Sequence, residues 1–143
     1  MARDFAAPTL HPHGLAFGDG KLFVGCQSRY VTCINTTDGK IIWENTDGLA
    51  NRAFNVWHAC YAYGRVYWHD LGEGTTGATK CLDAETGETL WKAMTLANIG
   101  YNQFCVADGK VYGQQSDGST TTGRPETADS FACWDAFTGE VLW

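Results

Sequence analysis

The residues of this chain with the widest range of possible chemistry are its six cysteines. A thiol can form a disulfide, bind zinc, or act as a nucleophile where its pKa is lowered. No two cysteines have the Cys-x-x-Cys spacing of a zinc knuckle. His11 and His13 flank a proline, a pattern more typical of a solvated loop than of a metal site. The acidic residues of the polar stretches lack the ligand spacing of an EF-hand; these are Asp70, Glu73, Asp117, Glu126 and Asp129. The sequence therefore predicts no metal site and no catalytic residue.

Three of the cysteines belong to a repeated spacing, in which a Gly follows the Cys by six residues and a Trp follows the Gly by four. The copies are Cys33, Gly39 and Trp43, then Cys81, Gly87 and Trp91, then Cys133, Gly139 and Trp143. Successive cysteines are 48 and then 52 residues apart. A period of this length is typical of stacked supersecondary units.

A second repeat in the same register predicts the elements that carry these residues. Its copies begin Gly-Lys-Leu-Phe at Gly20, Gly-Arg-Val-Tyr at Gly64 and Gly-Lys-Val-Tyr at Gly109. Each unit contains four short runs rich in β-branched and aromatic residues, separated by Gly, Asp and Asn. Asp19-Gly20 and Asp108-Gly109 are strong hairpin signals, because Asp-Gly supplies the positive φ angles of a tight turn. No apolar stripe of helical period occurs, so we predict an all-β fold.

Composition and charge exclude several function classes. The aromatic content of 13%, the charged content of 18% and the 17 glycines are typical of a turn-rich sheet protein. A net charge of −6 without a basic cluster argues against nucleic-acid binding. No apolar run is long enough to span a membrane. The first residues lack the apolar core of a secretion signal, so the chain is either cytosolic or without its true start.

The repeated units resemble blades of the quinoprotein (PQQ-dependent dehydrogenase-like) β-propeller superfamily. That family's tryptophan-docking motif has Ala, Asp, Thr, Gly and Trp at fixed positions. The second and third copies match it with Asp83, Thr86, Gly87 and Trp91 and with Asp135, Thr138, Gly139 and Trp143. The first copy is looser, and all three have Cys where the family usually has Ala. The resemblance implies a partial β-propeller of three four-stranded antiparallel blades, part of a six- to eight-bladed ring. We expect an extension or partial strand over 1–12 and blades over 13–49, 50–98 and 99–143.

The physical role predicted for the motif is to lock neighbouring blades together. A four-stranded blade buries both faces only when other blades cover it. A Trp that follows a Gly suits an indole stacked on a bare peptide, and burial of the ring contributes roughly 3–6 kcal/mol as an upper figure. We therefore predict blade docking as the role of the recurring residues, with Cys33, Cys81 and Cys133 as small buried hydrophobes beside the rings.

Three blades do not close a ring, and an open stack exposes apolar faces. The sequence favours a fragment of a longer propeller, so that the partners are its remaining blades. The alternative is a ring closed by further copies of the chain. Equivalent cysteines on neighbouring blades lie too far apart for most disulfides, with Cys60 and Cys105 the least unsuitable pair. We expect buried free thiols.

Enzymes of the family hold PQQ and calcium near the propeller axis, beside a disulfide between adjacent cysteines. The segment from Leu15 resembles the strand after that disulfide, but Ala7 and Pro8 stand where the cysteines would fall. No cofactor-binding residue can therefore be assigned, and no cofactor is evident in this chain. The sequence favours a non-catalytic propeller that binds or scaffolds protein or surface partners. The alternative is a fragment of a PQQ- and calcium-dependent alcohol or sugar dehydrogenase whose catalytic blades lie elsewhere.

Two long loops suggest where a partner binds. The connections between second and third strands lengthen from blade to blade, reaching 71–77 in the second and 116–130 in the third. Insertions at equivalent sites of a repeat emerge on one face, which is often the binding face. We expect a protein partner on this face, with a surface insertion of no function as the alternative. The family resemblance suggests an extracytoplasmic location.

Overall fold

The computed structural model describes residues 12–26, 31–47, 59–71, 76–96, 104–115 and 130–143. Within these ranges the chain is all-β, as predicted, with eleven strands and no helix. They form two four-stranded sheets and one three-stranded sheet, all antiparallel. The described part of the chain contains no helix that is long and apolar enough to cross a membrane.

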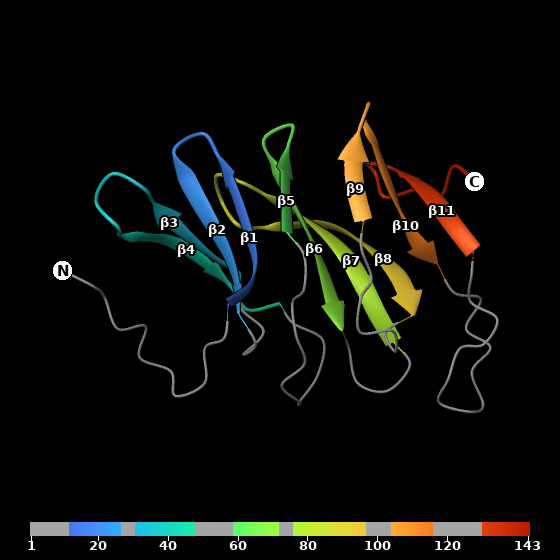
Figure 1. Cartoon of the computed structure of the whole chain (residues 1–143), viewed down its shortest axis with the longest axis horizontal. Coiled ribbons are helices and arrows are strands. Elements are labelled where there is room, and N and C mark those ends of the chain that lie inside the picture. The colour runs from blue at the N-terminus through green and yellow to red at the C-terminus, as the bar shows by residue number, and fades with distance from the viewer. Residues whose placement is uncertain (1–11, 27–30, 48–58, 72–75, 97–103, 116–129) are drawn as a thin grey trace.

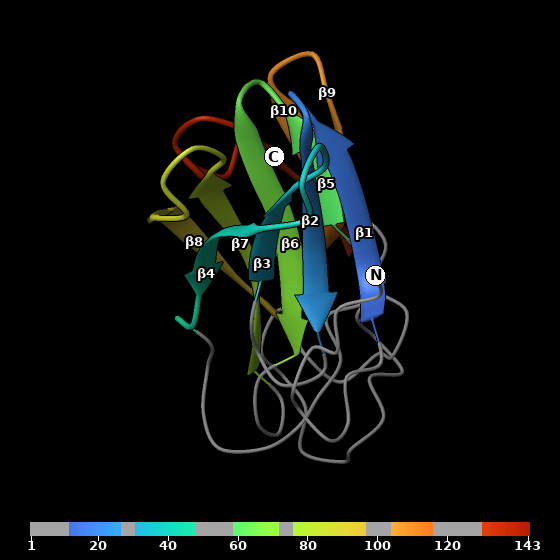
Figure 2. The same cartoon turned by 90° about the vertical axis from the view of Figure 1, so that its left-hand side faces the viewer.

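Each sheet is built from consecutive strands (Figure 1). The first comprises β1 (Pro12–Gly18), β2 (Lys21–Cys26), β3 (Val31–Asn35) and β4 (Ile41–Asn45). The second comprises β5 (Ala59–Ala62), β6 (Arg65–Leu71), β7 (Thr76–Asp83) and β8 (Thr89–Leu96). The third comprises β9 (Phe104–Ala107), β10 (Lys110–Gln115) and β11 (Ser130–Asp135). The sheets follow one another side by side, with β1, β5 and β9 in equivalent places (Figures 1 and 2).

The first two strands of every sheet are joined by a two-residue turn with two positive φ angles. Asp19-Gly20 has φ of 48° and 70°, and Asp108-Gly109 has 50° and 68°. These values suit the primed turns whose twist matches that of the flanking strands. Tyr63-Gly64, with 56° and 68°, adopts the same conformation without the Asp that made the other two predictable. This conformation is uncommon for a bulky residue, and contacts of Tyr63 with the next sheet accompany it.

The third sheet differs from the prediction of three four-stranded blades. Residues 141–143 follow β11 but form only an isolated bridge between Trp134 and Val141, with backbone hydrogen bonds between Cys133 and Trp143. In the first two sheets the pairing of the fourth strand runs mainly from the recurring Trp onward. At this position of the third sheet the described residues form the bridge and these backbone hydrogen bonds, but no fourth strand.

The long connections are only partly described. Residues 72–75 and 116–129 lie outside the described ranges, as do residues 1–11 and the link around Ser28 and Arg29. The loop predicted over 71–77 is shorter than expected, because Leu71 ends β6 and pairs with Gly77 of β7. Asp70, which was expected in a polar stretch between strands, lies within β6.

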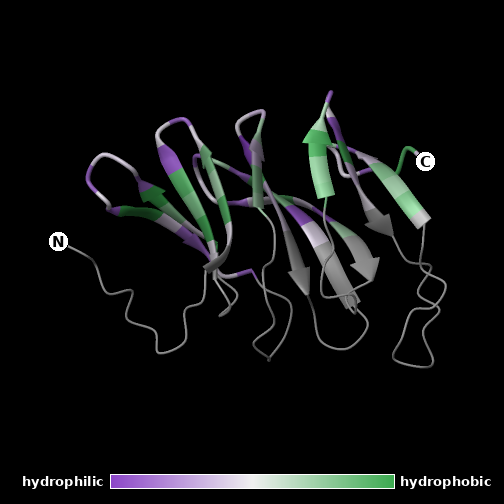
Figure 3. Ribbon diagram, viewed as in Figure 1, coloured by the Kyte–Doolittle hydropathy of each residue, from purple (hydrophilic) through white to green (hydrophobic). Residues whose placement is uncertain are grey.

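The sheets bury their apolar residues in two separate cores, one between each pair of neighbouring sheets. Hydrophobic residues recur along the strands of all three sheets (Figure 3). Alternate residues of the middle sheet point to opposite sides. Val66 and Trp68 of β6 belong to the first core, whereas Tyr67 between them belongs to the second. The middle sheet thus contributes residues to both cores, and both cores depend on the contacts between sheets.

Candidate functional site

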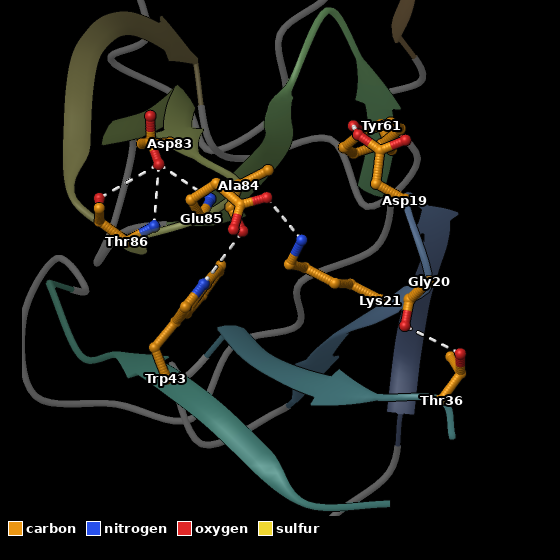
Figure 4. A network of polar contacts seen from close by, with 10 residues as sticks. All are labelled: Asp19, Gly20, Lys21, Thr36, Trp43, Tyr61, Asp83, Ala84, Glu85 and Thr86. Atoms are coloured by element: carbon orange, nitrogen blue, oxygen red, sulfur yellow. Dashed lines mark hydrogen bonds and ion pairs between the residues drawn. The ribbon is translucent and has the colours of Figure 1, made fainter. Parts of the chain in front are cut away.

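The first junction, between the sheets β1–β4 and β5–β8, brings the indole of Trp43 onto the turn that contains Gly87. A Cβ atom placed on Gly87 would lie 2.5 Å from the indole ring, so no other residue fits there without displacing the ring. The indole Nε1 donates a hydrogen bond of 3.2 Å to the carbonyl oxygen of Ala84 (Figure 4). Trp43 of one sheet therefore fills a site formed by the backbone of the next.

The second junction, between β5–β8 and β9–β11, repeats this arrangement. Trp91 lies on Gly139, where a Cβ atom would come within 2.7 Å of the ring. Its Nε1 donates a 3.0 Å hydrogen bond to the carbonyl oxygen of Ala136. Trp91 is only 9% exposed, and it packs among the residues of the second core.

The remaining Gly and Trp of the predicted set do not meet. Trp143 is 65% exposed. No atom lies within 4 Å of a Cβ placed on Gly39, although its φ of 68° resembles those of Gly87 and Gly139. Among the described residues two docking sites are thus complete, and the Gly39 turn and the Trp143 indole on the two outer sheets have no counterpart there.

The Asp and Thr of the motif shape the turn under the indole. The Asp83 carboxylate accepts hydrogen bonds from the backbone N–H groups of Glu85 and Thr86, both of 2.8 Å. These N–H groups, with that of Thr86 foremost, hold the pKa of Asp83 below its usual value. Asp135 accepts the same two bonds from Phe137 and Thr138, which lower its pKa in the same way. In the looser first copy, Asn35 accepts a 2.8 Å bond from the N–H of Thr37.

A β-bulge next to the Trp recurs in both complete sheets and was not predicted. The pairing of β3 with β4 shifts between Cys33 and Ile34, directly after the pair Cys33–Trp43. The pairing of β7 with β8 shifts in the same way after Cys81–Trp91. A bulge re-aims the side chain beside it. No residue type in the sequence marks these positions.

Charged and polar side chains complete the first junction. Lys21 forms a 2.5 Å ion pair with Glu85 across the junction, and the Tyr61 hydroxyl donates to Asp19 in the opposite direction (Figure 4). Farther out, Asp47 forms a 2.6 Å ion pair with Lys92 and accepts a 3.0 Å hydrogen bond from Thr89. The hydrogen bond from Lys92 is the main reason that the pKa of Asp47 lies below its usual value.

Aromatic contacts complete the second junction. The Tyr67 hydroxyl, fully buried, donates a 3.1 Å hydrogen bond to the Ala136 carbonyl that also accepts the Trp91 indole. Arg65 donates a 2.9 Å bond to the carbonyl oxygen of Phe137, and its guanidinium lies 5.0 Å from the centre of the Phe137 ring. The Tyr63 hydroxyl accepts a 3.0 Å bond from the N–H of Gly109.

The thiols of Cys33 and Cys81, beside the docking indoles, are poor nucleophiles in this environment. Cys33, Cys81 and Cys133 are buried free thiols, and Cys33 and Cys81 pair with Trp43 and Trp91 across their strands. Burial raises the pKa of the Cys33 and Cys81 thiols to about 11. Cys60 is a free thiol as well. Cys105, expected to be buried, is an exposed free thiol, because its side of β9 is not covered by another sheet.

Metal-ligating side chains are dispersed in the described ranges, which contain no group of three or more His, Cys, Asp or Glu residues. Several acidic and histidine residues considered above lie outside those ranges; these are His11, Glu73, Asp117, Glu126 and Asp129. The side chains of His13 and Asp70 are likewise not described. Most of the face that the two long loops were expected to form also lies outside the described residues.

A family model matches more than half of the chain. The model of a PQQ-type repeat family, described as "Outer membrane protein assembly factor BamB", matches residues 4–92. No curated protein matches the chain.

Solved structures with the same fold include natural and designed proteins. Quinohemoprotein alcohol dehydrogenase ADHIIG from Pseudomonas putida HK5 is 18% identical with a TM-score of 0.73, and 90% of this chain covers 25% of it. Quinohemoprotein alcohol dehydrogenase from Comamonas testosteroni is 19% identical with a TM-score of 0.69, and 90% of this chain covers 26% of it. The computationally designed Ika4 protein is 15% identical with a TM-score of 0.65, and the whole of this chain covers 79% of it. The chain thus spans about a quarter of the two dehydrogenases.

Proposed function

Since the chain belongs to the PQQ-like β-propeller repeat family, we propose that it is a non-catalytic propeller segment that serves as a binding or scaffold module for protein or surface partners. Its three sheets correspond in this proposal to blades over 13–49, 50–98 and 99–143. The description of the family model as an assembly factor supports a role in binding. Family membership also supports a location outside the cytoplasm.

One observation carries the proposal: the repeated residues are used to hold blades together. Trp43 and Trp91 fill backbone sites on the neighbouring sheet, while the Asp and Thr of each matching motif shape the turn beneath. We assign blade docking to the full recurring set, namely Cys33, Gly39, Trp43, Cys81, Asp83, Thr86, Gly87, Trp91, Cys133, Asp135, Thr138, Gly139 and Trp143. Residues committed to packing in this way supply rigidity to a scaffold rather than chemistry to a substrate.

The residues described here do not fit a PQQ and calcium site. The resemblance calls for two adjacent cysteines and a cluster of oxygen ligands. The cysteines of this chain are all separated in the sequence, and within the described ranges no cluster of His, Cys, Asp or Glu forms. Cys33 and Cys81 lie beside docking indoles with raised pKa values. We therefore derive no reaction step from these residues.

The alternative function is a segment of a PQQ- and calcium-dependent alcohol or sugar dehydrogenase whose catalytic blades lie outside this chain. The dehydrogenases among the solved structures of the same fold favour it. At 18–20% identity these similarities establish the fold alone. In either case the remaining blades, or further copies of the chain, would be its first partners.

A cofactor titration of the full-length protein separates the two functions. PQQ and calcium are added, and quinone absorbance and dye-linked alcohol oxidation are measured beside a known quinoprotein dehydrogenase. We expect neither signal for a scaffold protein. Stoichiometric PQQ binding with alcohol-dependent dye reduction would establish the dehydrogenase instead.

A second experiment tests the predicted partner face. Removal of residues 118–127 from the full-length protein should abolish cross-linking to its partner while the thermal unfolding midpoint stays the same. Partner cross-linking that persists at the level of the intact protein would exclude this loop from the interface.

A further inference from the structure

The outer face of the third sheet has the same arrangement of aromatic residues as the faces that form the two junctions. Tyr112 lies 6.3 Å from Trp143 between ring centres, as Tyr67 lies 6.0 Å from Trp91 and Phe23 lies 5.8 Å from Trp43. Phe131, two residues before the recurring Cys, is 64% exposed. The residues at that position in the other sheets, Val31 and Thr79, are buried because another sheet covers them. The third sheet therefore presents the same pattern without its cover.

In the first two sheets, the basic residue that begins the second strand contacts one position of the docking turn in the next sheet. Lys21 begins β2 and pairs with Glu85, which directly follows the carbonyl that accepts the Trp43 indole. Arg65 begins β6 and contacts both the ring and the carbonyl of Phe137, which directly follows the carbonyl that accepts Trp91. We call this position, one residue after the indole acceptor, the selector position. Its residue is acidic in one junction and aromatic in the other.

The third sheet carries a basic residue, and the first sheet a selector position, that do not contact each other. Lys110 begins β10, and the hydrogen bond that the structure gives its ammonium is a 3.3 Å contact with the carbonyl of Asp108, two residues away. On the first sheet the selector position is held by Thr37, which is exposed. Threonine offers Lys110 neither a negative charge nor an aromatic face.

We propose that the free face of the third sheet takes a docking turn with glycine beneath the indole and with an acidic or aromatic residue at the selector position. The proposed partner is therefore a blade of different sequence, and an unaltered second copy of this chain, which has Thr37 at the selector position, binds more weakly. The selector residue determines which blade follows which, while the indole supplies most of the binding. The inference rests on the proposed docking role and adds the chemistry of the partner.

The selector contact is exposed, which sets the size of its effect. The side chains of Lys21 and Glu85 are 14% and 71% exposed, and an ion pair of this kind changes an association constant by about fivefold at most. Salt weakens it, because exposed charges are screened. Such a contact is too weak to create a junction and strong enough to choose between competing blades.

The test converts the first sheet into the preferred partner of the third. Thr37→Glu places an acid at the free selector position of the full chain. The turn should accept it, since Glu85 occupies the same place with the same backbone hydrogen bond to the preceding Asx side chain. Head-to-tail association is measured by sedimentation over a concentration series at low salt. We expect Thr37→Glu to associate about threefold to fivefold more tightly than the unaltered chain.

Matched variants establish the cause. Thr37→Lys should associate no more tightly than the unaltered chain, and Lys110→Glu should remove the gain of Thr37→Glu. Trp143→Ala should remove association altogether, and added salt should remove only the gain. Equal association of the unaltered and Thr37→Glu chains, or none for any variant at millimolar concentration, would overturn the inference. Because this experiment measures association and not cofactor binding, its failure is distinct from failure of the non-catalytic proposal.

Discussion

The two junctions share their centre and differ at their edges. In both, an indole rests on a glycine of positive φ and donates to the carbonyl three residues before it. The first junction surrounds this centre with ion pairs, Lys21 with Glu85 and Asp47 with Lys92. The second surrounds it with the buried Tyr67 hydroxyl and with the stacking of Arg65 on Phe137. The repeated Trp and Gly therefore hold neighbouring sheets together in both junctions. The residues that vary between copies give each junction a different set of surrounding contacts.

The largest expected effect comes from removal of an indole. Trp91→Ala should destabilise the chain by about 3–5 kcal/mol, because a large buried ring and its hydrogen bond are lost. Trp43→Ala should have a smaller effect, since Trp43 is more exposed and its hydrogen bond is longer. Denaturant unfolding measures both. The control is Trp143→Ala, expected within about 0.5 kcal/mol of the unaltered chain. A loss at Trp143 equal to that at Trp91 would contradict the comparison.

The next effect comes from filling the space beneath an indole. Gly87→Ala should cost about 2–4 kcal/mol, because the added methyl group overlaps the Trp43 ring and φ is 76°. Gly39→Ala has a similar φ but meets no neighbouring atom, so it should cost only about 1–2 kcal/mol. The difference between the two unfolding free energies isolates the indole contact. Equal losses of unfolding free energy in the two variants would mean that the positive φ, and not contact with the ring, requires glycine at position 87.

A smaller effect should separate the edges of the two junctions. Tyr67→Phe gives the second junction the residue type that Phe23 gives the first, and it removes one of the two donors to the Ala136 carbonyl. We expect a loss of about 1 kcal/mol, since the Trp91 indole still satisfies that carbonyl. Tyr112→Phe, on the uncovered face, is the matched control with little expected change. The free energies of unfolding of the unaltered chain and of both variants are compared. An unchanged value for Tyr67→Phe would show that the Tyr67 hydroxyl does not stabilise the second junction.

The smallest effect concerns pH. The folded pKa of Asp47 lies below its unfolded value of about 3.9, so its contribution is present above that pH and is lost as pH falls through the folded pKa. Because Asp47 is half exposed, Asp47→Asn should cost less than about 1 kcal/mol near pH 7. The difference from the unaltered chain should shrink in acid and at high salt. A difference that is unchanged at about pH 3 would assign the effect to the side-chain amide and not to charge.

The strands and docking pairs were predictable because they depend on local patterns. Asp19-Gly20 and Asp108-Gly109 predicted hairpins, since these residues tolerate positive φ. Tyr63-Gly64 gave no comparable signal, because Tyr63 is held in the same conformation with the help of Phe137 and Gly109 of the next sheet. In the third sheet the described residues form three strands, with a bridge between Trp134 and Val141 where the first two sheets have their fourth strand.

The sequence by itself determined that the chain is made of repeated all-β units and that each carries an indole and a glycine suited to one another. Short-range spacing and residue type are sufficient for this, because turns and strand alternation are local. Only the tertiary structure decided which copies meet: Trp43 lies on Gly87, and Trp91 lies on Gly139. It also decided the partners of Lys21, Arg65 and Tyr67, which are 64 to 72 residues away in the sequence. Contacts of this range depend on how whole sheets stack, and no local pattern encodes them.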